Sequence, residues 1–243
     1  MSDFHEEPIG GGIIVCTSQA HRFGTDAFLL TRFSRYREKD LVTELGTGCG
    51  IIPLLMQKHR PPRMIWAADI QENAIEQLTA GMAASGITDG ITPVCADLRE
   101  LWDGAPLEHC DLVLCNPPYQ PPGSGFEAAD ASQRIARHGI HCTPEDVCRA
   151  GARLLKQGGR LCVCGRPERL PDYICAMRAA GTEPKRLRFV QKTAADRPWL
   201  FLLEGKRGAA SFLQMEPPFI MYENGTLTAE AAALYTNGEE TST

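Results

Sequence analysis

Short hydrophobic runs alternate between residues 41 and 204 with longer stretches in which apolar positions recur at helical spacing. This alternation predicts an α/β fold, in which a mostly parallel sheet carries crossover helices on both faces. The predicted strands are 41–45, 64–70, 91–96, 111–115, 160–164, 186–191 and 199–204, the last two forming a hairpin. The predicted helices are 28–36, 51–59, 72–85, 144–157 and 170–180, several of them bounded by glycine or proline. We therefore expect a seven-stranded sheet.

The 243 residues fit one domain, which we divide into three parts. Residues 1–40 form an N-terminal addition with a possible strand at 11–16, residues 41–207 the core, and residues 208–243 a C-terminal tail. The start of the chain is acidic and glycine-rich, without the pattern of a signal peptide, and no apolar run is long enough to span a membrane. We expect a cytoplasmic protein with no membrane partner.

The charge balance gives a mixed indication about partners. The net charge is −5, from 25 Lys and Arg against 30 Asp and Glu, so the overall basic character of many nucleic-acid-binding proteins is lacking. A local cluster at Lys185, Arg186, Arg188, Lys192 and Arg197 is either a binding patch or a solvated strand face. Ten cysteines are scattered without C-x-x-C spacing, which favours reduced core thiols over a zinc site, and we expect no metal.

A glycine-rich turn, Gly46-Thr-Gly48-Cys-Gly50, lies between the first core strand and the first core helix. Glycines at such a turn let a ligand approach the main chain, and an acidic residue about 20 positions later can bind ribose hydroxyls. Asp69, 19 residues after Gly50, has that position. The G-x-G-x-G spacing differs from the G-x-G-x-x-G dinucleotide pattern. Glu44, just before the turn, would repel a pyrophosphate and suits a ligand with an ammonium group.

Asn116-Pro117-Pro118-Tyr119 follows the fourth core strand, at the sheet edge where α/β proteins bind ligands. The prolines stiffen the backbone, and the Asn116 carbonyl together with main-chain carbonyls can accept both hydrogens of an amino group. Those hydrogen bonds free the nitrogen lone pair for attack on a methyl sulfonium, and the carbonyl dipoles stabilise the charge that develops on nitrogen. Tyr119 offers a ring for stacking on a planar substrate. The motif suits adenine N6, guanine N2 or a glutamine amide.

The sequence E-L-G-x-G-x-G resembles the first motif of the class I S-adenosylmethionine methyltransferases, which have a Rossmann-like fold. The resemblance implies that the glycine turn lines the methionine and ribose part of the cofactor, that Glu44 lies near its amino acid end, and that Asp69 binds the ribose. It also implies that Asp97, after the third strand, binds the adenine amino group. The predicted cofactor-binding residues are Thr25, Asp26, Glu44, Gly46, Thr47, Gly48, Gly50, Asp69, Ile70, Asp97, Leu98 and Asn116.

The chain as a whole resembles the bacterial tRNA1(Val) adenine-N6 methyltransferase family, through Arg22-Phe-Gly-Thr-Asp26, Ala136-Arg-His138, Arg166-Pro-Glu-Arg169 and Pro184-Lys-Arg-Leu-Arg-Phe189. The resemblance implies that Thr25 and Asp26 lie by the cofactor and that the substrate is an adenine near the tRNA anticodon. It departs from the family at Gly139, where a glutamate often follows the loop histidine. The expected tRNA-binding patch consists of Arg134, Arg137, Arg166, Arg169, Lys185, Arg186 and Arg188.

Other functions compete with this one. A release-factor glutamine methyltransferase shares Asn-Pro-Pro-Tyr, but that family has a sizeable helical domain before the core, where this chain has about 40 residues. An rRNA guanine-N2 methyltransferase usually has a duplicated N-terminal domain. A non-catalytic binding module would show a broken Asn-Pro-Pro-Tyr motif or lost glycines, and both are intact here. A nicotinamide oxidoreductase would show the G-x-G-x-x-G spacing of the dinucleotide pattern. We therefore predict an S-adenosylmethionine-dependent N-methyltransferase acting on tRNA.

Overall fold

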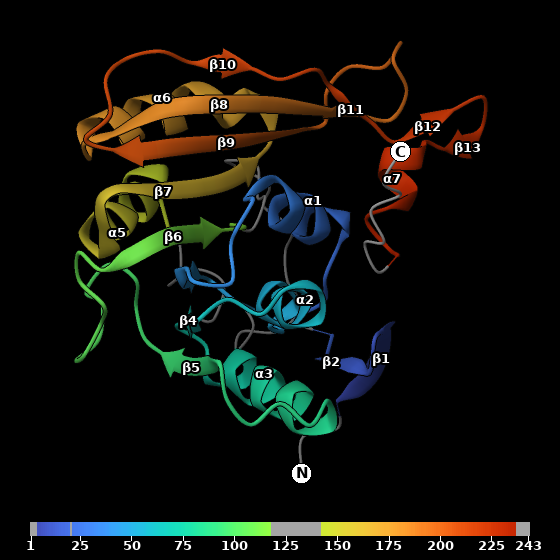
Figure 1. The fold of residues 1–243 in the computed structure, drawn as a ribbon, viewed down its shortest axis with the longest axis vertical. Helices are drawn as coiled ribbons and strands as arrows, with labels where there is room; N and C mark the ends of the chain where they lie inside the picture. Colours follow the sequence, from blue (N-terminus) through green and yellow to red (C-terminus); the bar gives the residue numbers. More distant parts are fainter. Residues whose placement is uncertain (1–3, 20, 118–141, 237–243) are drawn as a thin grey trace, which may run out of the picture.

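The computed structural model describes residues 4–19, 21–117 and 142–236. All seven predicted strands are present in one sheet, in the order β8-β9-β7-β6-β3-β4-β5 (Figure 1). Strands β5, β4, β3, β6 and β7 run parallel, while β9 is antiparallel to β7 and to β8, which confirms the hairpin. Their bounds are β3 Leu41–Leu45, β4 Met64–Asp69, β5 Ile91–Cys95, β6 Cys110–Cys115, β7 Leu155–Gly165, β8 Thr182–Gln191 and β9 Leu200–Arg207.

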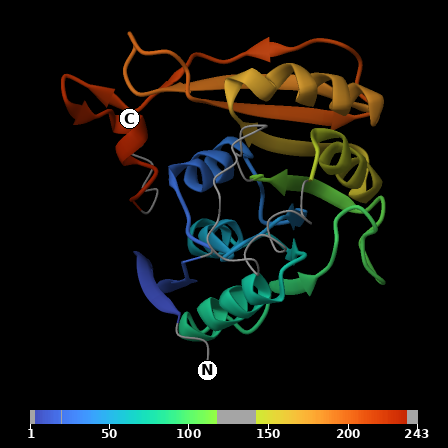
Figure 2. The same cartoon turned by 180° about the vertical axis from the view of Figure 1, so that it is seen from behind.

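Helices cover both faces of the sheet, as predicted (Figures 1 and 2). Helices α1 (Thr25–Phe33) and α2 (Ile51–His59) and part of α3 (Glu72–Ala84) pack in one hydrophobic cluster with the inner strands. Helices α5 (Pro144–Leu154) and α6 (Leu170–Ala179), the latter preceded by the 3-10 turn η1 (Pro167–Arg169), pack in a second cluster. Each cluster buries one side of the sheet, so both faces of the central strands are hydrophobic.

Two helices differ from the prediction by more than one residue at an end. Helix α1 begins at Thr25 and ends at Phe33, rather than covering 28–36. Helix α5 has the predicted Thr143 cap, whose hydroxyl accepts from the Asp146 amide, but it ends at Leu154 rather than Gln157. Leu155 is already extended and pairs with Cys110. A Cβ on Gly159 would lie 2.8 Å from the Cys110 carbonyl oxygen, so the lack of a side chain here lets β7 lie close to β6. Gly159 therefore belongs to strand β7 and does not mark the end of the helix.

Both ends of the chain add structure to the core. Residues 5–17 form a hairpin of β1 (His5–Gly10) and β2 (Ile13–Thr17), where we predicted one strand at 11–16. After β9, β10 (Gln214–Met215) and β11 (Phe219–Ile220) pair with β8 at the sheet edge and bring the sheet to nine strands. The tail then forms the small hairpin β12 (Tyr222–Glu223) and β13 (Thr226–Leu227), followed by α7 (Ala229–Ala232).

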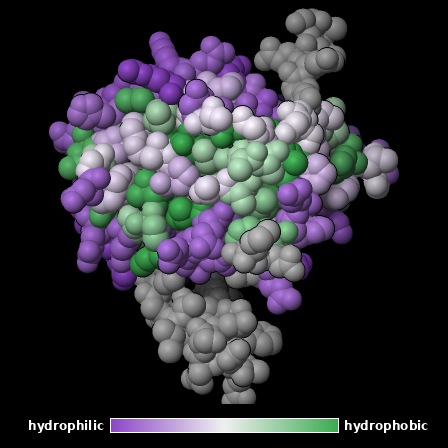
Figure 3. Space-filling view, turned by 90° about the horizontal axis from the view of Figure 1, so that it is seen from below, coloured by the Kyte–Doolittle hydropathy of each residue, from purple (hydrophilic) through white to green (hydrophobic). Residues whose placement is uncertain are grey.

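Most of the cysteines lie in the core. Seven of the ten are buried, and Cys95 and Cys175 are exposed. Burial raises the pKa of Cys49 and Cys148 to about 12, so these thiols stay protonated in the core. Viewed from the α3–β5 end, the surface mixes hydrophobic residues at the centre with hydrophilic ones around them, as is usual for folded domains (Figure 3). No helix in the described ranges is long and apolar enough to cross a membrane.

Candidate functional site

A cavity of about 350 Å³ lies at the carboxyl edge of the parallel strands. Its walls come from the residues before and within the first turn of α1, the turn after β3, the end of β4, the residues after β5 and the end of β6. Its volume falls within the range of small-molecule sites, and its place matches the rule for ligands of open α/β sheets. Of the twelve predicted cofactor-binding residues, ten line the cavity; the exceptions are Thr25 and Gly50.

The glycine turn is shaped in a way that leaves space for a ligand. Gly46, Gly48 and Gly50 all have positive φ, which L-residues with a side chain adopt only at a cost. A Cβ on Gly46 or Gly48 would meet nothing within 4 Å, whereas a Cβ on Gly50 would lie 2.4 Å from Leu78 Cδ1. The first two glycines therefore keep the cavity open, and the third lets α2 pack against α3.

Glu44 is a buried carboxylate at the floor of this cavity. It is 2% exposed and accepts a hydrogen bond of 2.5 Å from the Thr47 hydroxyl. Burial raises the pKa of Glu44 well above its usual range, and the nearby charge of Asp69 adds to the rise, while the Thr47 hydrogen bond opposes it. A cationic ligand group would compensate the cost of ionising this carboxyl.

Asp69 ends β4 and organises the loop around it. One carboxylate oxygen accepts from the Gly48 amide at 2.9 Å and the other from the Gln71 amide at 3.0 Å. The turn is also tied to β4, because the Gly46 and Thr47 amides both donate to the Ala68 carbonyl. Each Asp69 oxygen has further acceptor capacity, which suits the two neighbouring hydroxyls of a ribose.

Asp97 follows β5 and is held by a neighbour that sequence reasoning missed. Arg99 donates to its carboxylate from the backbone amide, from Nε and from Nη2, at 2.9, 2.9 and 2.5 Å. The Arg99 hydrogen bonds hold the pKa of Asp97 below its usual range. Both residues line the cavity. Asp97, the predicted acceptor for an adenine amino group, therefore also accepts hydrogen bonds from the Arg99 guanidinium.

Asn116 and Pro117 line the cavity directly after β6, the strand next to β3. The Asn116 Oδ1 accepts a hydrogen bond of 3.1 Å from the Cys164 thiol of the neighbouring strand β7. Pro118 and Tyr119 lie outside the described residues. Sequence analysis treated Cys164 only as a small core residue. Its contact depends on strand register, since Cys115 pairs with Val163 and the next residues of each strand therefore meet.

The segment before α1 contributes a further wall, including His21, Arg22 and Phe23. Arg22 and Phe23 belong to a motif quoted from the sequence, whereas His21 does not. Asp26 lines the cavity, as predicted. Thr25 points elsewhere, and its hydroxyl lies 3.1 Å from the hydroxyl of Tyr235 in the C-terminal tail. Within the described residues, no cluster of His, Cys, Asp and Glu could hold a metal ion.

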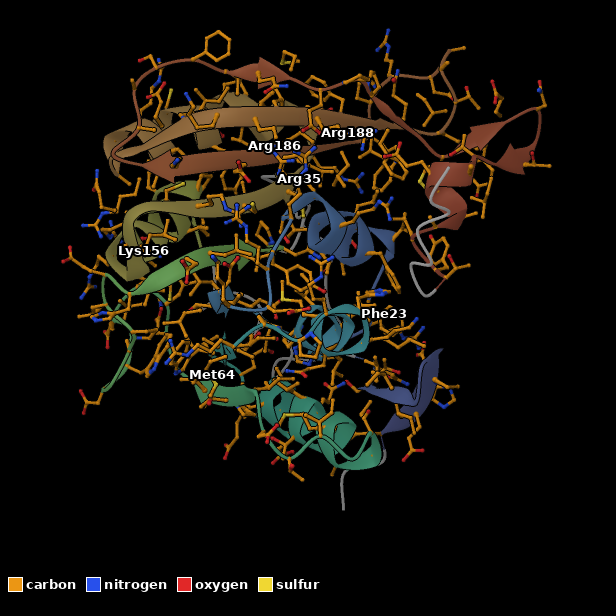
Figure 4. All side chains as sticks on the ribbon, in the orientation of Figure 1. Phe23, Arg35, Met64, Lys156, Arg186 and Arg188 are labelled. Carbon is orange, nitrogen blue, oxygen red and sulfur yellow. The ribbon has the colours of Figure 1, made fainter. Side chains whose placement is uncertain are left out.

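The predicted basic patch is not continuous. Arg186 is 7% exposed and pairs with Glu204 at 3.0 Å and Glu216 at 3.2 Å, so it lies inside the fold rather than on a solvated face (Figure 4). Arg188 forms two hydrogen bonds with Glu230, at 2.7 and 2.8 Å. Lys185 lies six residues before the end of β8, about 20 Å from the carboxyl edge at strand spacing.

The remaining members of the predicted patch are Arg166, Arg169, Arg134 and Arg137. Arg166 and Arg169 follow β7 at the carboxyl edge, near the strand that carries Asn116. Arg169 forms an ion pair of 2.7 Å with Asp172. Arg134 and Arg137 lie outside the described residues, as do His138 and Gly139.

Solved structures with similar folds are methyltransferases. A predicted O-methyltransferase from Agrobacterium tumefaciens superposes with a TM-score of 0.68 at 19% identity, covering 86% of this chain and 94% of the other. The M. jannaschii TYW2 protein, solved in complex with AdoMet, superposes with a TM-score of 0.54 at 13% identity, covering 85% and 86%. The fold is thus that of the Rossmann-like class I methyltransferases.

Sequence comparison narrows this class to a family. The family model of the methyltransferase small domain matches residues 18–171, and the chain belongs to this family. A curated relative from Tolumonas auensis is named tRNA1(Val) (adenine(37)-N6)-methyltransferase and is 28% identical over 185 residues, which cover 76% of each chain. For further relatives with the same name, the aligned region covers 56–65% of their length.

Proposed function

We propose that this protein methylates the N6 amino group of an adenine in tRNA near the anticodon, using S-adenosylmethionine. The observation that carries the proposal is the position of Asn116-Pro117, which lines the same cavity as the open glycine turn and the carboxylates of Glu44 and Asp69. The names of the curated relatives support tRNA adenine as the substrate.

The residues present fit S-adenosylmethionine. The space that a Cβ would fill at Gly46 and Gly48 accepts the methionine and ribose part, and the buried Glu44 carboxyl suits its ammonium group. Asp69 keeps acceptor capacity for the ribose, and Asp97 for the adenine amino group. When bound, the cofactor supplies an electrophilic methyl group on a sulfonium.

The protein's own residues orient the substrate nitrogen. The Cys164 thiol donates to the Asn116 carbonyl oxygen and fixes the direction of this side chain. An amide oxygen can accept more than one hydrogen bond, and in the proposed reaction it accepts a proton of the substrate amino group. Held in this way, the amino nitrogen presents its lone pair to the cavity, and the Asn116 dipole stabilises the positive charge that develops on nitrogen.

For the RNA, we propose contact at the carboxyl edge around Arg166 and Arg169. Arg166 is exposed, stacks over Trp199 at 5.9 Å and donates to the Trp199 carbonyl at 3.0 Å. A guanidinium held beside an indole combines charge for phosphates with a surface for stacking bases. The adenine would be splayed out of the anticodon loop to reach Asn116.

The proposal is tested with purified full-length protein, methyl-labelled S-adenosylmethionine and tRNA that lacks the modification. We expect label in N6-methyladenosine after digestion to nucleosides. Asn116→Ala should abolish labelling while thermal stabilisation by the cofactor persists, since Asn116 acts on the substrate. Asn73→Ala, at an exposed position on α3, is the matched control and should retain full activity.

Two results would contradict the proposal. Unlabelled tRNA together with labelled release factor or ribosomal RNA would assign the site to a glutamine or guanine amino group. Full labelling of adenine by Asn116→Ala would show that the Asn-Pro motif has no part in the reaction.

A further inference from the structure

The C-terminal tail, residues 208–236, has no assigned role, and it lies outside the family match at 18–171. It runs along the outer edge of β8 through β10 and β11, and then turns so that α7 lies beside α1 (Figures 1 and 2). Its last described turn therefore approaches the helix whose first residues form one wall of the cofactor cavity.

The tail is firmly attached to the core. Phe219, Met221, Ala231 and Leu234 are all buried, and they belong to the same hydrophobic cluster as the inner side of α1. These apolar contacts anchor the tail to the core.

Two glutamates of the tail add ion pairs to this attachment. Glu216 lies 2.9 Å from Arg35, just beyond the C-terminal end of α1, and 3.2 Å from Arg186 on β8 (Figure 4). Glu230 on α7 holds Arg188 through two hydrogen bonds. The tail thus contacts the region around α1 both beyond its end and near its beginning.

Tyr235 connects the tail to the first turn of α1. Its ring centroid lies 5.3 Å from that of Phe28, and its hydroxyl lies 3.1 Å from the Thr25 hydroxyl. Phe28 in turn lies 6.1 Å from Phe23, which lines the cavity. A row of three aromatic rings therefore leads from the tail to the cavity wall.

The first turn of α1 depends on such contacts. Its N-cap is Gly24, which has no side chain to accept from the first-turn amides. Helices without an N-cap side chain fray more readily at their first turn. Within the turn, the Asp26 carboxylate accepts from the Ala27 amide at 3.1 Å, and Gly24, Asp26 and Ala27 all line the cavity. Packing adds to this side-chain hydrogen bond, and Tyr235 supplies the packing on the outer side.

We propose that the segment 229–235 holds the first turn of α1 in the conformation that binds the cofactor, with Tyr235 as the positioning residue. The inference rests on the proposed use of S-adenosylmethionine and deepens it. Tyr235 acts through Thr25 and Phe28 and does not touch the cofactor.

The ring contributes more than the hydroxyl. The hydrogen bond to Thr25 is exposed, so water replaces it at little cost. The aromatic pair is worth roughly 1 kcal/mol beyond its buried area, which corresponds to about a fivefold change in an equilibrium constant. Tyr235→Phe should therefore bind the cofactor nearly as well as the wild type, whereas Tyr235→Ala should raise its Kd by roughly fivefold.

The experiment measures the Kd for S-adenosylmethionine by calorimetry, and KM and kcat with tRNA, in full-length variants. Tyr222→Ala is the matched control, because Tyr222 lies in the same tail on β12 and is 37% exposed, against 43% for Tyr235. We expect a raised Kd in Tyr235→Ala, rescue in Tyr235→Phe, and an unchanged kcat at saturating cofactor. Glu230→Gln, which loosens α7 from Arg188, should raise the Kd in the same direction.

The outcomes separate this inference from the proposed function. A wild-type protein that does not bind S-adenosylmethionine would overturn both. A wild type that binds, with Tyr235→Ala equal to Tyr222→Ala, would overturn the role of Tyr235 alone. A raised KM for tRNA in Tyr235→Ala with an unchanged cofactor Kd would also overturn it, because the ring would then contact the substrate.

Discussion

Replacing Glu44 by glutamine should weaken cofactor binding while stabilising the free protein. The side chain keeps its shape and can still accept from Thr47, but it loses its charge. In the free protein the buried carboxyl is costly to ionise, as its raised pKa indicates. In the complex the same charge would pair with the ammonium group of the cofactor. One substitution therefore acts on the two states in opposite directions.

The magnitudes follow from these environments. A hydrogen bond to a charged group is worth about 1.5–3 kcal/mol, so the Kd should rise by about 10- to 150-fold. In the free protein, Glu44 has a higher pKa in the folded state than its ordinary value of 4.5 in the unfolded chain. Its contribution to the free energy of unfolding is therefore complete below pH 4.5 and is lost as the pH rises through the pKa of the folded state. At neutral pH, glutamine removes that loss, and the unfolding temperature should increase.

The assay combines calorimetry with thermal unfolding. The wild-type Kd should rise as the pH falls and Glu44 takes up its proton, and binding should release a proton that is detected by comparing buffers of different ionisation enthalpy. Glu44→Gln should show neither effect. The reasoning would be refuted if the variant bound as tightly as the wild type, or if it bound weakly because its free form had become less stable.

Two further predictions concern the walls of the cavity. Gly50→Ala should lower the free energy of unfolding by about 2–5 kcal/mol, from left-handed backbone strain and the clash with Leu78. Gly46→Ala has the same backbone strain, about 1–2 kcal/mol, without the clash, and should in addition weaken cofactor binding because its Cβ enters open space in the cavity; equal unfolding temperatures of the two variants would contradict this. Arg99→Ala should return the pKa of Asp97 toward its usual range, measured by NMR titration of the carboxyl carbon, and an unchanged titration would show that Arg99 does not hold it.

The core of the fold could be predicted from sequence because local patterns determine it. The strand at 41–45 and the helix at 51–59 have the predicted bounds, since apolar periodicity and the glycine turn agree there. The same turn and the acids at the ends of the next two strands line the cavity, as most of the predicted cofactor-binding residues do. Parallel strands bring their carboxyl ends to one edge, so the position of each residue in its strand was sufficient.

The remaining features depend on contacts between distant segments. Arg186 reads as a surface residue beside Lys185 and Arg188, yet its partners Glu204 and Glu216 lie on the next strand and in the tail. The bond between Cys164 and Asn116 requires the register of β6 and β7. The tail shows no strong periodicity, and its helix has only four residues, so its packing on α1 could not be inferred from the sequence.

The bonds between α1 and later parts of the chain also bear on synthesis by the ribosome. The Phe33 carbonyl accepts from Arg186, 153 residues later, and Arg35 pairs with Glu216, 181 residues later. Because the chain emerges from its N-terminus, α1 leaves the ribosome long before these partners exist. A nascent chain that ends before β8 therefore has the glycine turn and its acids but not the groups that secure α1. The ordered wall of the cavity is completed only after the segment up to Tyr235 has been translated.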